Sequence, residues 1–275
     1  MLTVSQLFIY PVKSLGGILV SSAQLTDRGF QYDRRWMLVD EQNRFLTQRQ
    51  YPQMALLQTG ITDKGIAVWH KHNSIDQIVI PFLAPAGERE IVAIWNDQCE
   101  AVFISQQLDA WFSSRLGIAC RLVFMPDDSL RKVDTRYAVH KTDITTFSDD
   151  YPLLLIGQAS LDDLNSRLEN PLPMDRFRPN IVFTGGEPYE EDEMEHFTIA
   201  DIRFYGVKLC SRCVVTTINQ ESIQKGKEPL KTLATYRTAN NKIYFGQNVV
   251  YAGTGSVQIG DSVNIISRRN KPGFQ

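Results

Sequence analysis

Two cysteines placed two residues apart are the residues of this chain best suited to chemistry. Cys210 and Cys213 lie in the segment KLCSRCVVTTIN, between two β-rich stretches. Such a pair can help to bind a zinc ion, form a redox-active dithiol, or supply a single thiolate to a soft metal. It can also be an idle buried pair.

The surrounding residues favour some of these alternatives over others. A structural zinc site normally needs four nitrogen or sulfur ligands, but no second CxxC follows, and Cys99 and Cys120 stand alone. A thioredoxin-like dithiol lies at the start of a helix, whereas the β-branched residues after Cys213 favour a strand. Arg212 and Lys208 would favour an ionised sulfur. A single thiolate ligand therefore competes mainly with the idle pair.

Other residues are of the types that bind a phosphate group. Lys13 and Ser14 follow a strand-like run and precede two glycines, so an ammonium, a hydroxyl and flexible backbone amides lie close together. Arg178 and Asn180 are two residues apart, and in an extended segment they would point toward the same ligand. Taken alone, each of these charged groups is more often an ordinary solvated surface charge.

The wider pattern resembles the MOSC family, named for the molybdenum cofactor sulfurase C-terminal domain. KLCSRCVVTTIN followed by KEPLKTLATYR matches the family's spacing from Cys213 to Glu228 and to Tyr236 and Arg237. FRPNIVFTGG, YPVKSLGG and YDRRWMLVD resemble the branch that includes the mitochondrial amidoxime-reducing component and its bacterial relatives. The resemblance covers nearly the whole chain.

The resemblance implies a site for the molybdenum cofactor, in which a pterin with a phosphate group carries the metal. It implies that Cys213 is the metal ligand and the catalytic residue, and that Cys210 is not required as a ligand. In the segment FSDDYP only Asp149 carries over, because Asp150 and Tyr151 stand where the family has hydroxyl residues. The implied cofactor-binding residues are Lys13, Ser14, Arg34, Asp149, Arg178, Asn180, Ser211 and Arg212.

By the same resemblance, the expected function is reduction of small N-hydroxylated substrates, namely hydroxylamines, amidoximes and N-hydroxylated bases. The cofactor would perform the redox step, and the protein would bind and orient. Some relatives append a ferredoxin-like domain, and this chain ends at Gln275 without one. The expected electron donor is therefore a separate ferredoxin-like or flavin reductase protein.

Two other functions stay open at this stage. One is a carrier that binds the molybdenum cofactor, or sulfur destined for other enzymes, without turnover of its own. The other is a purely structural β-rich adaptor. At the family level the resemblance also carries an association with pyridoxal phosphate binding.

Bulk properties limit the partners. The chain has 29 basic and 31 acidic side chains and a net charge of -2, which gives no general attraction to nucleic acid or acidic membranes. No run approaches membrane-spanning length, and the N-terminus lacks the features of a secretory signal. Four cysteines are too few for a disulfide scaffold. We therefore expect a cytoplasmic protein with no nucleic-acid or membrane partner.

The elements that must position these residues are mostly strands. The expected fold is mainly β with a few helices (α+β), with an N-terminal MOSC-associated β domain over residues 1–120 and a MOSC β-barrel over 121–275. LTVSQLFIYPV alternates, and MLVDEQNRFLTQ has two apolar ends around a turn at Asp40 to Asn43. Strand alternation should point Arg34 and Arg35 to opposite faces.

Capping signals predict two helices. One spans about 106–116, with Ser105 as its cap and Gly117 at its end. The other begins at Ser160 as its cap and is stopped by the prolines of NPLP. The later runs RPNIVFTGG, IADIRFYGVKL, VVTTIN, NKIYFGQNVVY and SVQIGDSVNII predict strands, with a turn at Gly260 and Asp261.

Overall fold

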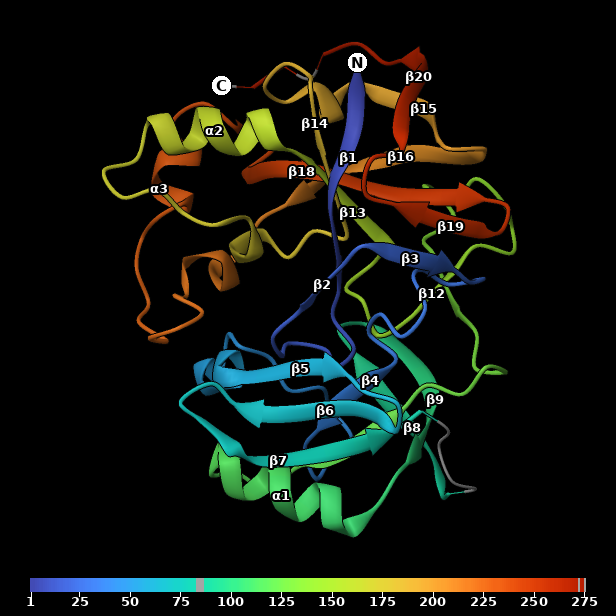
Figure 1. Ribbon diagram of the computed structural model, residues 1–275, viewed down its shortest axis with the longest axis vertical. Coiled ribbons are helices and arrows are strands. Elements are labelled where there is room, and N and C mark those ends of the chain that lie inside the picture. The colour runs from blue at the N-terminus through green and yellow to red at the C-terminus, as the bar shows by residue number, and fades with distance from the viewer. Residues whose placement is uncertain (83–86, 272, 275) are drawn as a thin grey trace.

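The computed structural model of the protein describes residues 1–82, 87–271 and 273–274. Figure 1 shows two β-rich units stacked along the long axis: strands and a helix between residues 36 and 124 form the lower unit, and the upper one is a barrel that contains the N-terminal strand. The described residues are mainly strands with three α-helices, which confirms the predicted fold class.

Seven strands close the upper unit into a ring within the described part of the chain. In ring order they are β13 (Leu153–Gly157), β14 (Ile181–Thr184), β1 (Leu2–Ile9), β20 (Ser262–Arg268), β15 (Met194–Ile199), β16 (Ile202–Ser211) and β18 (Lys242–Ala252), and β18 pairs with β13. Closure pairs every strand of the ring on both sides, so the ring itself has no free edge. Buried side chains such as Phe197, Phe204 and Val249 fill the interior.

Short strands extend this barrel. They are β2 (Ile18–Val20) beside β1, β17 (Thr238–Ala239) beside β18, and the pair β3 (Ser22–Leu25) with β19 (Gly255–Gln258). β1 is a strand of the barrel, although it lies at the N-terminal end of the sequence. The boundary between residues 120 and 121 stays a prediction.

The lower unit packs two antiparallel sheets around its own core. One sheet has the order β5 (Leu57–Ile61), β6 (Gly65–His70), β7 (Asn73–Pro81), and the other has the order β4 (Trp36–Val39), β10 (Arg121–Phe124), β9 (Asp97–Phe103), β8 (Arg89–Ile94). Trp36, Leu57, Phe112 and Leu122 are among the side chains that fill the space between the sheets and helix α1. A two-stranded pair, β11 (Arg131–Lys132) and β12 (Ile144–Thr145), connects the units.

Helix α1 (Gln106–Leu116) confirms the first helix prediction. The Ser105 hydroxyl accepts a hydrogen bond from the backbone N–H of Leu108 at 3.2 Å, and Gly117 ends the helix with a φ of 66°. Both signals are local, because a cap and a left-handed end depend on residues within one turn.

The predicted start of the second helix is wrong. Helix α2 (Gln158–Ser166) begins before Ser160, which makes no cap. The buried Ser160 hydroxyl donates to Glu191 Oε2 at 2.7 Å and accepts from the Tyr189 backbone N–H at 2.7 Å. A tertiary contact therefore uses the group that the sequence assigned to capping. A short third helix, α3 (Leu230–Leu233), was not predicted.

The strand predicted at VVTTIN is also wrong, because Val214–Thr217 form a 3₁₀ helix, η4. The hydroxyls of Thr216 and Thr217 donate to the carbonyls of Cys213 and Val214 at 2.9 and 2.8 Å. These local bonds offer the backbone an alternative to a sheet. The sequence argument against a helix after Cys213 therefore assumed a strand where the structure has a 3₁₀ helix.

The other later strand predictions are confirmed by β14, β16, β18, β19 and β20, and Gly260 forms the predicted turn with a φ of 97°. Of MLVDEQNRFLTQ, only the first apolar end forms a strand, β4. Three further 3₁₀ helices are η1 (Pro52–Leu56), η2 (Met174–Phe177) and η3 (Glu190–Asp192). Of the helices in the described ranges, none has both the length and the apolar character needed to cross a membrane.

Candidate functional site

A cavity of about 150 Å³ lies where the two units meet, and its wall contains side chains from both. The structure brings together every residue that the sequence predicted for the site. They are Lys13, Ser14, Arg34, Asp149, Arg178, Asn180, Ser211, Arg212 and Cys213. Their cofactor-binding roles stay predictions, but their convergence is a property of the fold.

Tight turns with unusual backbone angles aim several of these side chains. Ser14, Arg34 and Arg178 have φ values of 68°, 50° and 55°, in the left-handed region that non-glycine residues seldom occupy. Such strain is retained where surrounding contacts enforce it, often at functional sites. Because Arg178 is left-handed, the expected extended arrangement of Arg178 and Asn180 is wrong, although both still line the cavity.

Arg34 and Arg35 do point in different directions, but a turn causes this and not strand alternation. Arg34 donates to Asp33 Oδ2 at 2.6 Å and to Asn180 Oδ1 at 3.1 Å, on the cavity side. Arg35 donates to Asp127 Oδ1 at 2.7 Å, away from the cavity. Burial alone would lower the pKa of Arg34. The neighbouring Asp33 carboxylate outweighs this effect and raises the pKa, so Arg34 keeps its charge.

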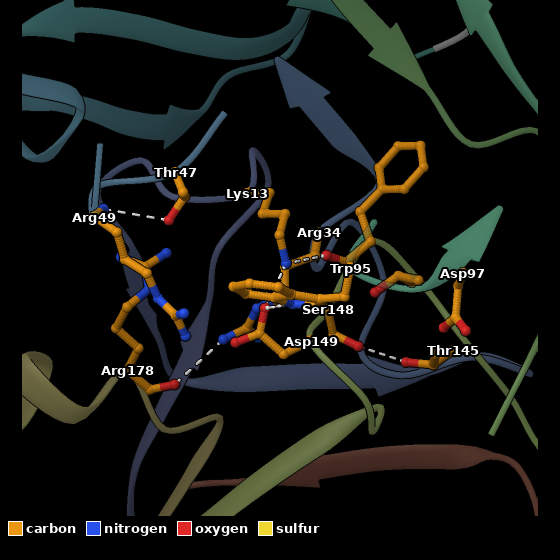
Figure 2. A network of polar contacts seen from close by, with 12 residues as sticks. Lys13, Arg34, Thr47, Arg49, Trp95, Asp97, Thr145, Ser148, Asp149 and Arg178 are labelled. Atoms are coloured by element: carbon orange, nitrogen blue, oxygen red, sulfur yellow. Dashed lines mark hydrogen bonds and ion pairs between the residues drawn. The ribbon is translucent and has the colours of Figure 1, made fainter. Parts of the chain in front are cut away.

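An ion pair joins the two sides of the cavity. Lys13 Nζ lies 2.7 Å from Asp149 Oδ1 and donates to the Phe147 carbonyl at 2.7 Å, while the Trp95 indole N–H donates to the same Asp149 oxygen at 3.1 Å (Figure 2). Burial lowers the pKa of Lys13, and Asp149 partly opposes this. The surrounding protein would raise the pKa of Asp149, but Lys13 and Trp95 outweigh it and hold that pKa below its usual value.

Cationic groups outnumber carboxylates in the cavity wall. Within the described ranges, no carboxylate lies within ion-pair distance of Arg49, Arg178 or Arg212. Arg178 stacks over the Tyr10 ring at 4.2 Å, and burial lowers its pKa to about 10, which leaves it charged at neutral pH. The surplus of positive charge fits an anionic ligand such as a phosphate.

The two cysteines of the CxxC differ in their surroundings. Cys213 lies two residues after the end of β16, at the residue before η4, with its side chain partly exposed at the cavity. Arg212 donates to Cys210 Sγ at 3.0 Å and to the Phe177 carbonyl at 2.7 Å. Burial raises the pKa of Cys210 although Arg212 opposes the rise, so Cys210 is poorly suited to be a thiolate ligand.

Two sequence-based ideas about the cysteines need correction. Lys208 does not support the sulfurs, because its ammonium lies over the Tyr137 ring at 4.6 Å and is absent from the cavity wall. Cys99 and Cys120 belong to two separate cores of the lower unit, so the four thiols of the chain do not converge on one metal. Cys210 and Cys213 are left as the partly exposed thiols beside the cationic groups, and burial raises the pKa of Cys210.

Sequence reasoning missed the contribution of the lower unit to the wall. The missed residues include Thr47, Gln48, Arg49 and Trp95, together with Asn248 from β18. Gln48 positions Ser14 by donating to its carbonyl at 2.7 Å. One signal was available, because Trp95 occupies a two-residue turn between β8 and β9 where glycine or asparagine is usual.

The motif residues Tyr236 and Arg237 lie outside the cavity wall. Arg237 Nη2 contacts Asp192 Oδ2 at 2.7 Å, and the Tyr236 hydroxyl lies 2.7 Å from the Tyr189 hydroxyl. These residues form a buried cluster around η3. Their place in the sequence motif therefore reflects support of the barrel and not contact with a ligand.

Comparison with known proteins agrees with this arrangement. Residues 1–119 match the MOSC N-terminal beta barrel domain, and residues 142–264 match the MOSC domain. The chain is 33% identical to mitochondrial amidoxime-reducing component 1 of Mus musculus over 97% of this chain and 83% of that protein. It is 33% identical to the molybdenum cofactor sulfurase of Oryza sativa subsp. japonica over 87% of this chain, but over only 31% of that protein.

Proposed function

The chain belongs to the MOSC-domain family, and we propose that it is a molybdenum-cofactor-dependent reductase of N-hydroxylated compounds such as amidoximes and hydroxylamines. The observation that carries the proposal is the convergence of the partly exposed Cys213 thiol with a surplus of guanidinium groups in one cavity. The relatives named as amidoxime-reducing components match 97% of the chain and support a small-molecule substrate.

The residues present fit the cofactor by their chemistry. Cys213 would supply the thiolate that binds the metal, and Arg178 and Arg212 would hold the phosphate and pterin from the barrel side. Lys13 and Arg34 would add positive charge, with their own carboxylate partners fixing their positions. The bound cofactor would supply two-electron redox chemistry.

The reaction breaks the N–O bond of the substrate. Two electrons and two protons are consumed, the nitrogen is reduced, and the oxygen leaves as water. The electrons would come from a separate ferredoxin-like or flavin reductase protein. Asp149 is not suited to donate a proton, since Lys13 and Trp95 keep it ionised at neutral pH. We propose that the protons reach the substrate from water.

The experiment compares three proteins made in a host that synthesises the cofactor: wild type, Cys213→Ala and the matched Cys210→Ala. Molybdenum per chain is measured, and benzamidoxime reduction is assayed with an artificial electron donor. We expect wild type and Cys210→Ala to carry metal and turn over, and Cys213→Ala to lose activity. A wild type without molybdenum, or an active Cys213→Ala, would contradict the proposal.

A second candidate is a carrier of the molybdenum cofactor or of sulfur, which the match to the rice sulfurase favours. Turnover discriminates between the two functions. A carrier would hold molybdenum but reduce no N-hydroxylated compound with any donor. A cytoplasmic location and the family's association with pyridoxal phosphate stay predictions.

A further inference from the structure

Two side chains of the lower unit, Arg49 and Trp95, build one side of the cavity. Trp95 occupies the turn between β8 and β9, and Arg49 lies in the segment before η1. The Arg49 guanidinium carbon is 4.4 Å from the centre of the Trp95 ring, a cation–π contact. Figure 2 shows both residues beside Asp149, with the guanidinium of Arg49 directed toward that of Arg178.

Trp95 is a rigid wall of this cavity. Its φ of 54° is costly for a residue with a bulky side chain, and its turn position usually holds a glycine. The indole N–H is fixed on Asp149, and Phe45 packs edge-on against the ring at 4.7 Å. The side chain is nevertheless 42% exposed. The Arg49 guanidinium lies over part of this ring, and the uncovered remainder offers an apolar surface to a planar ligand.

Arg49 carries a charge that its surroundings do not neutralise. Among the described residues no carboxylate lies within ion-pair distance of it, and its buried Nε has no hydrogen-bond partner. Of the two described acids that line the wall, Asp149 is already paired with Lys13, and Asp150 makes no ion pair with Arg49. Arg178 and Arg212, which would hold the proposed cofactor, belong to the MOSC domain, whereas Arg49 comes from the N-terminal domain.

We propose, resting on the reductase function above, that Arg49 and Trp95 select planar N-hydroxylated substrates that carry an anionic group such as a carboxylate. The ring of the substrate packs against the indole, and its anion pairs with the Arg49 guanidinium. Guanidinium and carboxylate are geometrically matched, and such charge-assisted hydrogen bonds are among the stronger ones. The N-terminal domain thereby contacts and selects the part of the substrate that is remote from the N–OH group.

The test compares benzamidoxime with 4-carboxybenzamidoxime on holoenzymes carrying Arg49→Gln, Arg49→Lys or Trp95→Leu. Arg121→Gln is the matched control, because Arg121 also stacks on an aromatic ring of the lower unit, Phe103 at 3.8 Å, but outside the cavity. We expect Arg49→Gln to raise KM for the carboxylated substrate about tenfold and for benzamidoxime less than about twofold. Arg49→Lys should recover part of the preference.

Trp95→Leu should raise KM for both aromatic substrates by a larger factor than KM for hydroxylamine, which has no ring to pack against the indole. Equal losses for both amidoximes in Arg49→Gln, together with less molybdenum per chain, would assign Arg49 to the cofactor and overturn the proposal. Unchanged KM values in Arg49→Gln would overturn it as well.

A binding measurement separates failure of this proposal from failure of the reductase function. Calorimetric titration of the loaded protein with 4-carboxybenzamide and with benzamide needs no turnover and no electron donor. We expect wild type and Arg121→Gln to bind the carboxylated amide more tightly, and Arg49→Gln to lose that preference. If wild type reduces no amidoxime but keeps the preference, the selection stands and the reductase function fails; equal affinity for the two amides overturns the selection.

Discussion

Two places of the molecule hold arginine side chains in contrasting surroundings: half-buried and in part without an opposite charge in one, fully buried and paired with a carboxylate in the other. In the cavity beside Cys213, Arg49, Arg178 and Arg212 have no ion-pair partner among the described residues. Around η3, Arg237 contacts Asp192 at 2.7 Å, and the two side chains are only 3% and 0% exposed. Unmatched charge at a cavity therefore marks a ligand site, whereas matched charge without a cavity marks structural support.

The η3 cluster adds hydrogen bonds to this ion pair. Glu191 is fully buried and accepts the Ser160 hydroxyl at 2.7 Å, and Tyr189 donates to Asp163 at 2.6 Å. Burial raises the pKa of Glu191, and the neighbouring Asp192 raises it further. Burial thus favours the protonated form of Glu191, while Arg237 opposes the rise that burial causes in the pKa of Asp192.

The largest expected effect follows from breaking the buried ion pair between Arg237 and Asp192. Arg237→Met leaves Asp192 buried without its cation, which should lower the free energy of unfolding by about 3 kcal/mol. Urea denaturation of the cofactor-free protein measures the change. A loss below about 1 kcal/mol would show that the pair is not what stabilises this region. Arg237→Met combined with Asp192→Leu should recover much of the loss.

The next effect concerns the arginines of the cavity that have no ion-pair partner among the described residues, and an anion serves as the probe. Pyrophosphate should stabilise the cofactor-free wild type by about 1–3 kcal/mol at concentrations well above its Kd. The combined variant Arg178→Met and Arg212→Gln should show no such stabilisation. The readout is the rise in Tm against a sodium chloride control of equal ionic strength. Equal rises in both proteins would place the anion elsewhere.

A smaller effect appears in the pH dependence of stability. Glu191 binds its proton more tightly in the folded than in the unfolded state, whose glutamate pKa is about 4.3. Its favourable contribution is therefore complete below that pH and is lost as pH rises through the raised folded pKa. Glu191→Gln should flatten this decline by about 1 kcal/mol. Thermal unfolding between pH 4 and pH 8 tests it, and an unchanged slope contradicts it.

The smallest effect completes the comparison. Arg178→Met keeps the aliphatic contact with the Tyr10 ring but removes a charge that no carboxylate among the described residues balances. The unfolding free energy of the cofactor-free protein should change by less than about 0.5 kcal/mol. The same urea experiment as for Arg237→Met applies. A large loss would mean that Arg178 is structural and that the contrast between the two regions is false.

Local signals were enough to predict much of the fold. Ser105 and Gly117 defined α1 because both act within one helical turn, and the alternating runs defined the barrel strands. Ser160 misled because its hydroxyl is used by Glu191, which is distant in the sequence. The β-branched residues of η4 misled because threonine side chains bond their own backbone there.

The part of the site that recognisable motifs contain was predicted, in both domains, and the rest was missed. Cys213, Ser211 and Arg212 lie in one motif, and the resemblance joined them to Lys13 and Arg34. Arg49 and Trp95 come from a different domain, and no local pattern relates their positions to Cys213. Only the packing of the two units brings them to one cavity.

The proposed function depends on binding of molybdenum by the Cys213 thiolate. Mo K-edge X-ray absorption on metal-loaded wild type, Cys213→Ser and Cys210→Ser counts the sulfur neighbours of the metal directly. The Cys213→Ser protein should lose one sulfur neighbour, and Cys210→Ser should match wild type. If Cys213→Ser matches wild type, or if Cys210→Ser loses the sulfur, Cys213 is not the ligand.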